Sequence, residues 1–222
     1  MSWLKRVLGF GGPKPAGKIK SPARAAELPL GLSRTRMISL DRNLKQLLIG
    51  ESAVVVPDDE KVWAVGTVYF DQGKRILRFY LENKGYYVLF VMDGPGPDDI
   101  EDIILFEYSE VKTVASRAEL RHLVGPGSKI GVPYYELDDA EYTRQWGDED
   151  GHTEMTPMTE QVVDAEEKSY SVRHHSILYA RDLKLTNRRE YLFFSAEENE
   201  EGCVSLSTAI GVTLKITDIA VA

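Results

Sequence analysis

Residues 62–92 read VWAVGTVYFDQGKRILRFYLENKGYYVLFVM, and they carry the strongest indication of fold class in the 222-residue chain. Runs rich in Val, Ile, Leu, Tyr and Phe at 62–70, 75–81 and 86–92 are separated by short turn segments. β-Branched and aromatic residues favour strands, and such short links join antiparallel neighbours. The stretch therefore predicts an antiparallel meander.

Strand-like runs continue on both sides of this meander. They lie at 53–56, 103–108, 160–163, 170–181, 190–195, 203–207 and 212–219. Short helices are predicted at 39–49, with Asp41 as N-cap, and at 116–124, where Ser116 and Glu119 have the spacing of a capping box. The acidic stretch 138–151 is predicted as a short helix that runs into an exposed loop. The fold class is α+β, predominantly antiparallel β, with a few short helices.

The chain divides by composition into a tail and a β-rich body. Residues 1–27 form a basic tail rich in Pro and Gly, which break regular structure and predict a flexible linker. We expect two packed β-rich lobes at 28–125 and 126–222, and the alternative is one continuous domain over 28–222. Because the chain has one cysteine, Cys203, and no apolar run of about 18 residues or more, we expect a cytoplasmic protein, with a peripheral position at the inner membrane as a further expectation.

Charge is distributed unevenly between the tail and the body. The first 26 residues hold six Lys or Arg and no acid, which leaves 21 basic against 35 acidic residues, a net −14, for the remainder. Phosphate contacts need concentrated Lys and Arg, so a strongly acidic body argues against nucleic-acid binding. We predict no nucleic-acid partner.

The tip of the tail is the candidate contact site. Apolar side chains recur there at helical spacing with two cations between them, in the set Trp3, Leu4, Lys5, Arg6, Val7 and Leu8. Such a turn can insert shallowly into an anionic membrane, with each basic residue contributing about 1 kcal/mol. The alternatives are a disordered tail, or a tip that docks on its own core or in a groove of a partner.

Catalytic and metal-binding patterns are weak in this sequence. His174 and His175 would point to opposite faces of a strand, so they cannot jointly bind one ion. The acidic clusters lack the register of a calcium loop, and the Gly-rich turns match no nucleotide-binding motif. Cys203 follows a glycine in a predicted hairpin, where we expect an inert thiol. We predict no catalytic residue, no cofactor and no metal.

The chain resembles a known family along nearly its whole length. The opening MSWLKRVLGF at 1–10, the Pro-rich linker, LPLGL at 28–32 and the β segment from VGTVYF at 65–70 to FVM at 90–92 are similar to the YjfK-like family of uncharacterised bacterial proteins. The resemblance implies a cytosolic protein beside a PspA-like membrane-remodelling protein, in a membrane-stress or envelope-maintenance system. It carries no active-site residue across.

Three functional hypotheses follow from these observations. The first is a non-enzymatic accessory protein whose acidic body binds a protein partner and whose basic tail engages an anionic membrane surface or that same partner. The second is an enzyme or small-molecule-binding protein with a pocket between two β lobes, lined by Arg173, His174, Tyr179 and Asp182. The third is a homo-oligomer that pairs exposed strand edges.

Overall fold

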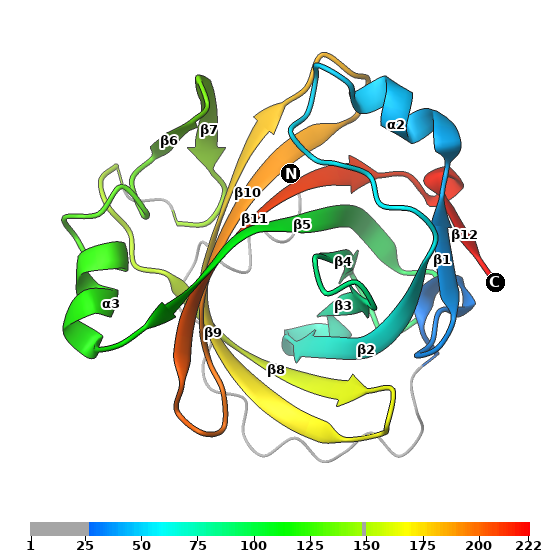
Figure 1. Ribbon diagram of the computed structural model, residues 1–222, viewed down its shortest axis with the longest axis horizontal. Coiled ribbons are helices and arrows are strands. Elements are labelled where there is room, and N and C mark those ends of the chain that lie inside the picture. The colour runs from blue at the N-terminus through cyan, green and yellow to red at the C-terminus, as the bar shows by residue number, and fades with distance from the viewer. Residues whose placement is uncertain (1–26, 148–149) are drawn as a thin grey trace.

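The computed structural model describes residues 27–147 and 150–222, and a closed antiparallel barrel lies at its centre (Figure 1). Its eight strands are, in chain order, β2 (Glu60–Tyr69), β3 (Arg75–Leu81), β4 (Tyr86–Met92), β5 (Ile100–Val114), β8 (Thr156–Asp164), β9 (Ser169–Asp182), β10 (Arg189–Glu198) and β11 (Val204–Leu214). Their spatial order is β2-β3-β4-β5-β11-β10-β9-β8, and β8 then pairs with β2. The barrel has no open edge, because this last pairing closes the sheet.

Smaller elements cover the barrel on two sides (Figure 1). One side carries β1 (Met37–Leu40), α2 (Arg42–Leu48) and β12 (Ile219–Val221), and the other carries α3 (Arg117–Val124), β6 (Tyr134–Leu137) and β7 (Ala140–Arg144). Short 3-10 turns lie at η1 (Pro29–Gly31), η2 (Asp71–Gly73) and η3 (Ile216–Asp218). The predicted class, predominantly antiparallel β with a few short helices, is confirmed.

Both halves of the chain contribute to the same barrel. Four barrel strands, β2 to β5, lie within 28–125, and the other four, β8 to β11, lie within 126–222. The halves meet at two seams, where Gly66 faces Val162 across β2 and β8, and Ala209 faces Tyr108 across β11 and β5. The two β-rich segments therefore close one sheet around one interior.

Apolar side chains form three cores around this sheet. Every barrel strand contributes to the interior cluster, whose largest members include Tyr87, Phe106, Trp146, Tyr191 and Phe193. A second cluster lies between the outer faces of β2 to β5 and the cover of α2, β1 and β12. The third lies under α3, β6 and β7. Because β3 and β4 are covered on both faces, they read in sequence as nearly continuous apolar runs rather than as an alternating pattern.

Side chains at the start of α2 and α3 accept hydrogen bonds from the free N–H groups of each helix. The Asp41 carboxylate accepts a hydrogen bond from the Asn43 N–H, and the Ser116 hydroxyl accepts one from the Glu119 N–H. The Glu119 carboxylate accepts in turn from the Ala115 N–H. The predicted N-caps at Asp41 and Ser116 are confirmed.

Three local predictions are wrong. The segments 203–207 and 212–219 are not two strands, because β11 runs without a break from Val204 to Leu214 and the 3-10 turn η3 follows it. Residues 53–56 are not a strand, because carboxylates rather than a neighbouring strand accept the N–H groups of Ala53 and Val55. Residues 138–144 are not a helix: Asp138 and Asp139 both have positive φ, 48° and 62°, and form the turn of the β6–β7 hairpin. Two consecutive residues with positive φ suit a tight hairpin and exclude a right-handed helix.

Candidate functional site

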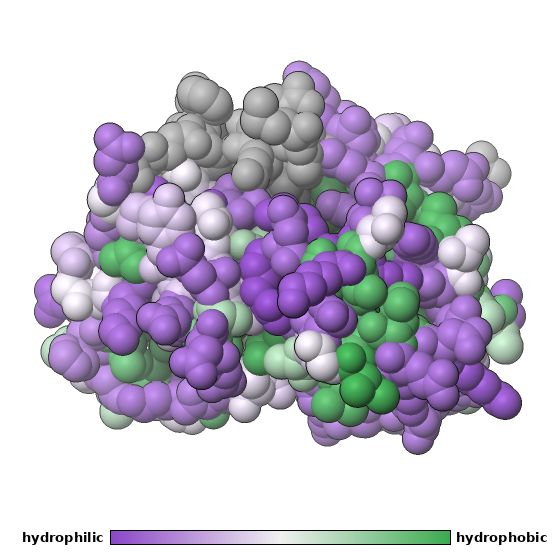
Figure 2. Space-filling view, turned by 90° about the horizontal axis from the view of Figure 1, so that it is seen from above, coloured by the Kyte–Doolittle hydropathy of each residue, from purple (hydrophilic) through white to green (hydrophobic). Residues whose placement is uncertain are grey.

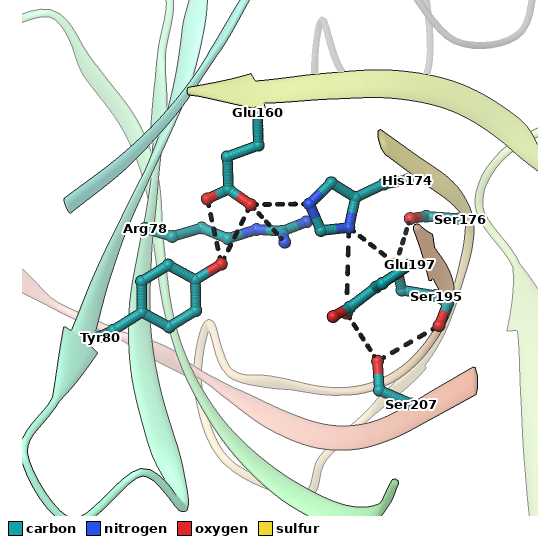
Figure 3. Close-up of polar contacts among 8 residues, drawn as sticks. All are labelled: Arg78, Tyr80, Glu160, His174, Ser176, Ser195, Glu197 and Ser207. Atoms are coloured by element: carbon teal, nitrogen blue, oxygen red, sulfur yellow. Dashed lines mark hydrogen bonds and ion pairs between the residues drawn. The ribbon is translucent and has the colours of Figure 1, made fainter. Parts of the chain in front are cut away.

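A polar cluster occupies one half of the barrel interior (Figure 3). Five strands supply its eight side chains: Arg78 and Tyr80 from β3, Glu160 from β8, His174 and Ser176 from β9, Ser195 and Glu197 from β10, and Ser207 from β11. Strand side chains alternate between faces, so each pair on one strand is two residues apart and points the same way. The cluster therefore draws together segments that are distant in sequence.

The Glu160 carboxylate is the centre of this cluster and is fully buried. It accepts hydrogen bonds from the Tyr80 hydroxyl at 3.0 Å and from the Arg78 guanidinium at 3.3 Å, and its Oε2 lies 2.7 Å from His174 Nε2. Burial alone would raise the pKa of Glu160, but the charge of Arg78 and the hydrogen bonds from His174 and Tyr80 hold it below its usual value. Glu160 is thus a buried carboxylate kept ionised by its partners.

Arg78 is almost fully buried, and aromatic rings surround its charge. Its guanidinium carbon lies 5.4 Å from the ring centroid of Phe193 and 5.7 Å from that of Tyr87. These distances allow cation–π attraction, which is strongest where water is excluded. Burial, together with the charge of Glu160, raises the pKa of Tyr80 well above its usual value, so its hydroxyl stays protonated as a donor.

A carboxylate–imidazole–hydroxyl chain runs through the cluster. His174 Nε2 faces Glu160, His174 Nδ1 lies 3.1 Å from Ser195 Oγ, and Ser195 Oγ lies 2.9 Å from Ser176 Oγ. A serine hydrolase connects its carboxylate, its histidine base and its nucleophilic serine in the same order. Both serines and the carboxylate are 0% exposed, however, so the chain as folded offers no access to a substrate.

The space beside the cluster is small. A cavity inside the barrel, lined by Arg78, Trp146 and apolar neighbours, holds about 10 Å³, and Ser195 is not among its lining residues. That volume admits at most one water molecule. At the opposite margin the cluster approaches solvent through Glu197, whose side chain is 24% exposed and accepts a hydrogen bond from Ser207 at 2.9 Å. The interior is packed protein, as in other barrels of eight strands.

A second feature lies outside the barrel, where apolar side chains gather over α2 and the segment after it. Leu47 is 43% exposed, Ile49 77% and Val55 62%; they are three of the eight large apolar residues exposed within 27–147 and 150–222. An open depression of about 370 Å³ adjoins Leu47, lined by Asp41, Asn43, Leu44, Gln46, Leu47, Arg188 and Asp218. We call these three side chains and the depression the α2 face.

Two carboxylates fix the far part of the α2 face to the barrel. Glu190 accepts the N–H of Ala53 at 2.7 Å, and Glu107 accepts the N–H of Val55 at 2.9 Å. Glu190 also accepts from the Tyr142 hydroxyl and from Arg181. Figure 2, which looks down on this side of the molecule, shows an apolar patch bordered by hydrophilic side chains. The segment that carries the exposed Val55 is therefore fixed to the barrel.

Comparison with known proteins identifies the family. The family model described as "Protein of unknown function (DUF2491)" matches residues 4–220. This chain belongs to the DUF2491 family. The DUF2491 chain is 27% identical over 209 residues to "Uncharacterized protein YjfK" of Escherichia coli (strain K12), over 91% of this chain and 94% of the relative. The predicted YjfK-like membership is confirmed, and no solved structure matches the DUF2491 chain.

The candidate contact residues of the DUF2491 tail, Trp3 to Leu8, lie outside the described residues, and their role stays a prediction. The four residues of the alternative pocket do not converge. His174 points into the barrel, whereas Tyr179 lies on the outer face and donates to the carbonyl of Val132. Arg173 pairs with Glu198, and Asp182 pairs with Arg189.

Sequence reasoning missed Arg78 and Glu160 as a site of this DUF2491 fold. A signal was present, because Arg78 lies in the middle of RILRFYL at 75–81, between apolar and aromatic residues that follow Arg75. A charged side chain between apolar residues of a strand either reaches solvent or pairs with another buried group, and the sequence does not identify that group. Glu160 lies 82 positions later, on the strand that closes the barrel.

Over residues 27–147 and 150–222, no three or more His, Cys, Asp or Glu side chains are grouped so that they could hold a metal ion. The helices of that same part of the chain are too short or too polar to cross a membrane.

Proposed function

We propose that this protein is a non-catalytic accessory protein that binds a protein partner through the α2 face and an anionic membrane surface through its basic tail. The observation that carries the proposal is the exposure of Leu47, Ile49 and Val55 on α2 and the segment after it, while the barrel interior is packed. Exposed apolar groups with a polar border are typical of protein-binding surfaces.

The partner implied by the family resemblance is a PspA-like membrane-remodelling protein, and the proposed setting is the cytoplasmic side of the inner membrane. The tail supports the membrane part of the proposal, because six cations without an acid precede a body of net −14. Each cation near an anionic surface contributes about 1 kcal/mol, and salt screens this attraction.

The membrane part is tested by flotation with phosphatidylglycerol vesicles at low and moderate salt. We expect the full chain to bind at low salt, and we expect Lys5→Glu/Arg6→Glu to lose that binding. Ile49→Asp/Val55→Asp changes two apolar residues outside the tail and serves as the matched control, which should still float. Equal binding by all three chains would refute a tail-dependent membrane contact.

The partner part is tested by photo-crosslinking in cells with a reactive residue at position 49 or at position 134. Tyr134 is 60% exposed on β6 and serves as the control position away from α2. We expect a crosslink to a PspA-like protein from position 49 and none from position 134. The same yield from both positions, or none from either, would contradict the assignment of the α2 face.

The alternative function is an enzyme, and the Glu160–His174–Ser195 chain is the observation that favours it. It requires the barrel to open, because Ser195 is fully buried. A fluorophosphonate probe distinguishes the two proposals. Labelling of the native chain that disappears in Ser195→Ala would establish a reactive serine, and an unlabelled native chain would favour the structural role.

A further inference from the structure

We propose that residues 3–8 of this chain dock in cis on the α2 face, so that the tail and the face shield each other until a membrane or a partner separates them. The inference rests on the proposed function, since it uses the same two surfaces. It adds that their uses are coupled: a tail on the α2 face cannot insert into a membrane, and an occupied face cannot bind a partner.

The apolar surfaces match in character. At helical spacing the tip presents Trp3, Leu4, Val7 and Leu8 on one side, and the α2 face presents exposed aliphatic side chains beside a depression of about 370 Å³. That depression is large enough for the indole of Trp3, and Leu44 and Leu47 form part of its wall. Burying such side chains contributes about 1.5–3 kcal/mol each when burial is complete.

Acidic side chains that could attract the basic tip lie near the α2 face, beside the cations Lys45 and Arg188. Asp41 borders the depression, and exposed Asp58 and Asp59 follow the Val55 segment. Asp58 pairs with Lys45 of α2 at 2.7 Å, which places this acidic group beside the helix. Lys5 and Arg6 interrupt the apolar tip with positive charge. Exposed ion pairs contribute only about 0–1 kcal/mol each, so charge steers the tip and apolar contact holds it.

The linker is long enough for docking in cis. The described chain starts beside the core that α2 covers, where Leu28 and Leu30 pack against the same cluster as Leu44 and Leu48. Residues 9–26 separate the tip from this point, and a flexible chain of that length spans about 23 Å on average and about 60 Å at full extension. A folded chain of this size has a radius of gyration of about 17 Å. The tip can therefore reach the α2 face.

Tethering makes a weak contact sufficient. A short flexible linker gives an effective concentration in the millimolar range. A contact with a dissociation constant near 1 mM is then occupied about half of the time, and one tenfold tighter about nine-tenths of the time. Such a contact also remains easy to displace, because a vesicle surface competes with about 1 kcal/mol for each cation of the tail.

Hydrogen exchange of the full chain tests the docking from the side of the face. Trp3→Asp/Leu8→Asp should speed amide exchange across 45–56 about twofold to fivefold, as expected for loss of a contact occupied half of the time or more. Ser21→Asp/Ala23→Asp adds the same charge to the linker and keeps the apolar tip, so it should leave this exchange unchanged. Identical exchange in all three chains would overturn the proposal.

Limited trypsin cleavage tests the docking from the side of the tail. Ile49→Asp/Val55→Asp should increase the rate of cleavage after Lys5 and Arg6 by a similar factor. The matched control is Val111→Asp/Tyr134→Asp, which places two acids at positions 62% and 60% exposed, outside the α2 face. Equal cleavage of both variants and the native chain would contradict docking on this face.

Dilution and vesicles complete the test. Protection of 45–56 that is independent of protein concentration supports docking in cis, and protection lost on dilution would overturn it in favour of a second copy. Phosphatidylglycerol vesicles should release the protection, whereas phosphatidylcholine vesicles should not. If the tail protects the face but the chain binds no vesicle, docking is supported and the proposed membrane function is refuted. If the chain binds vesicles but the tail does not protect the face, docking is refuted and the membrane function is supported.

Discussion

The two halves of the barrel interior are built on the same strands with opposite chemistry. Along β3 the apolar half holds Ile76 and the polar half begins at Arg78; along β10 Phe193 is followed two residues later by Ser195. The apolar half gains from burial in any arrangement that excludes water. The polar half gains only when each donor meets its acceptor, because an unpaired buried charge is costly. One half supplies stability and the other specifies the register of closure.

The position of Glu160 on β8 specifies the register in which β8 pairs with β2 and β9. A slip of β8 by one residue along β2 or β9 would turn this side chain out of the barrel and leave Arg78 without its carboxylate. The same slip would turn Met158 and Val162 out as well, but their loss from the interior would leave no charge unpaired. Substitutions in the two halves of the interior should therefore differ in their cost.

The largest effect is expected from Glu160→Gln, which leaves the buried guanidinium of Arg78 without a counter-charge. We expect a loss of about 3–5 kcal/mol in the free energy of unfolding, measured by urea denaturation at pH 7. The folded pKa of Glu160 is lowered, so its contribution is present above its unfolded pKa and disappears as pH falls through the folded pKa. The difference between native and variant chains should therefore shrink below about pH 4.

The pair Arg78→Met/Glu160→Leu is the control for that experiment. It removes both charges and should recover most of the lost stability, because replacing a buried ion pair by apolar groups is often neutral. If the double variant were as unstable as Glu160→Gln, packing rather than charge pairing would account for the loss.

Substitution of Gly66 and Gly211 compares how tightly side chains are packed in the two halves of the interior. A Cβ at Gly66 would lie 1.6 Å from Glu160 Oε1, and one at Gly211 would lie 2.6 Å from the ring of Phe106. Each change to Ala should cost about 1–3 kcal/mol in thermal or urea unfolding, with Gly66→Ala at the upper end. In a Glu160→Ala background, Gly66→Ala should add almost nothing, whereas Gly211→Ala should keep its full cost; equal additivity of both would contradict a clash with Glu160.

Asp102 places a titrating group at the apolar end of the barrel. Burial, with the charge of Glu101, raises its pKa to about 6. The folded state thus favours the protonated acid, and stability is lost as pH rises from the unfolded pKa to about 6. Asp102→Asn should stabilise the protein by about 2 kcal/mol at pH 8, after allowance for partial exposure, and by almost nothing at pH 4. A constant difference at both pH values would exclude this titration.

Ser195→Ala should have the smallest effect, about 1 kcal/mol by urea denaturation. It removes one hydroxyl from the chain of His174, Ser195 and Ser176 without removing a charge. Ser176→Ala is the matched variant and should cost a similar amount. A loss as large as that of Glu160→Gln would show that the hydroxyl chain, and not the charge pair, governs the polar half.

Local chemistry predicted part of this structure well. The strands at 75–81 and 86–92 have their predicted bounds, and both predicted N-caps are present. The segment 53–56 was misassigned, because four apolar or β-branched residues suit a strand equally well with or without a neighbour. At 138–144 the acidic residues favour a helix. The two positive φ values of the hairpin turn exclude a helix, but the composition of the segment does not reveal them.

Local sequence was enough to predict the antiparallel class, the meander at 62–92, the helix starts and the charge contrast between tail and body, because each depends on residues close together in the chain. The tertiary structure was needed to show that the two halves close one barrel, that Arg78 and Glu160 meet inside it and that Leu47, Ile49 and Val55 remain exposed. Those features depend on pairings such as Gly66 with Val162, and local periodicity carries no information about partners so distant.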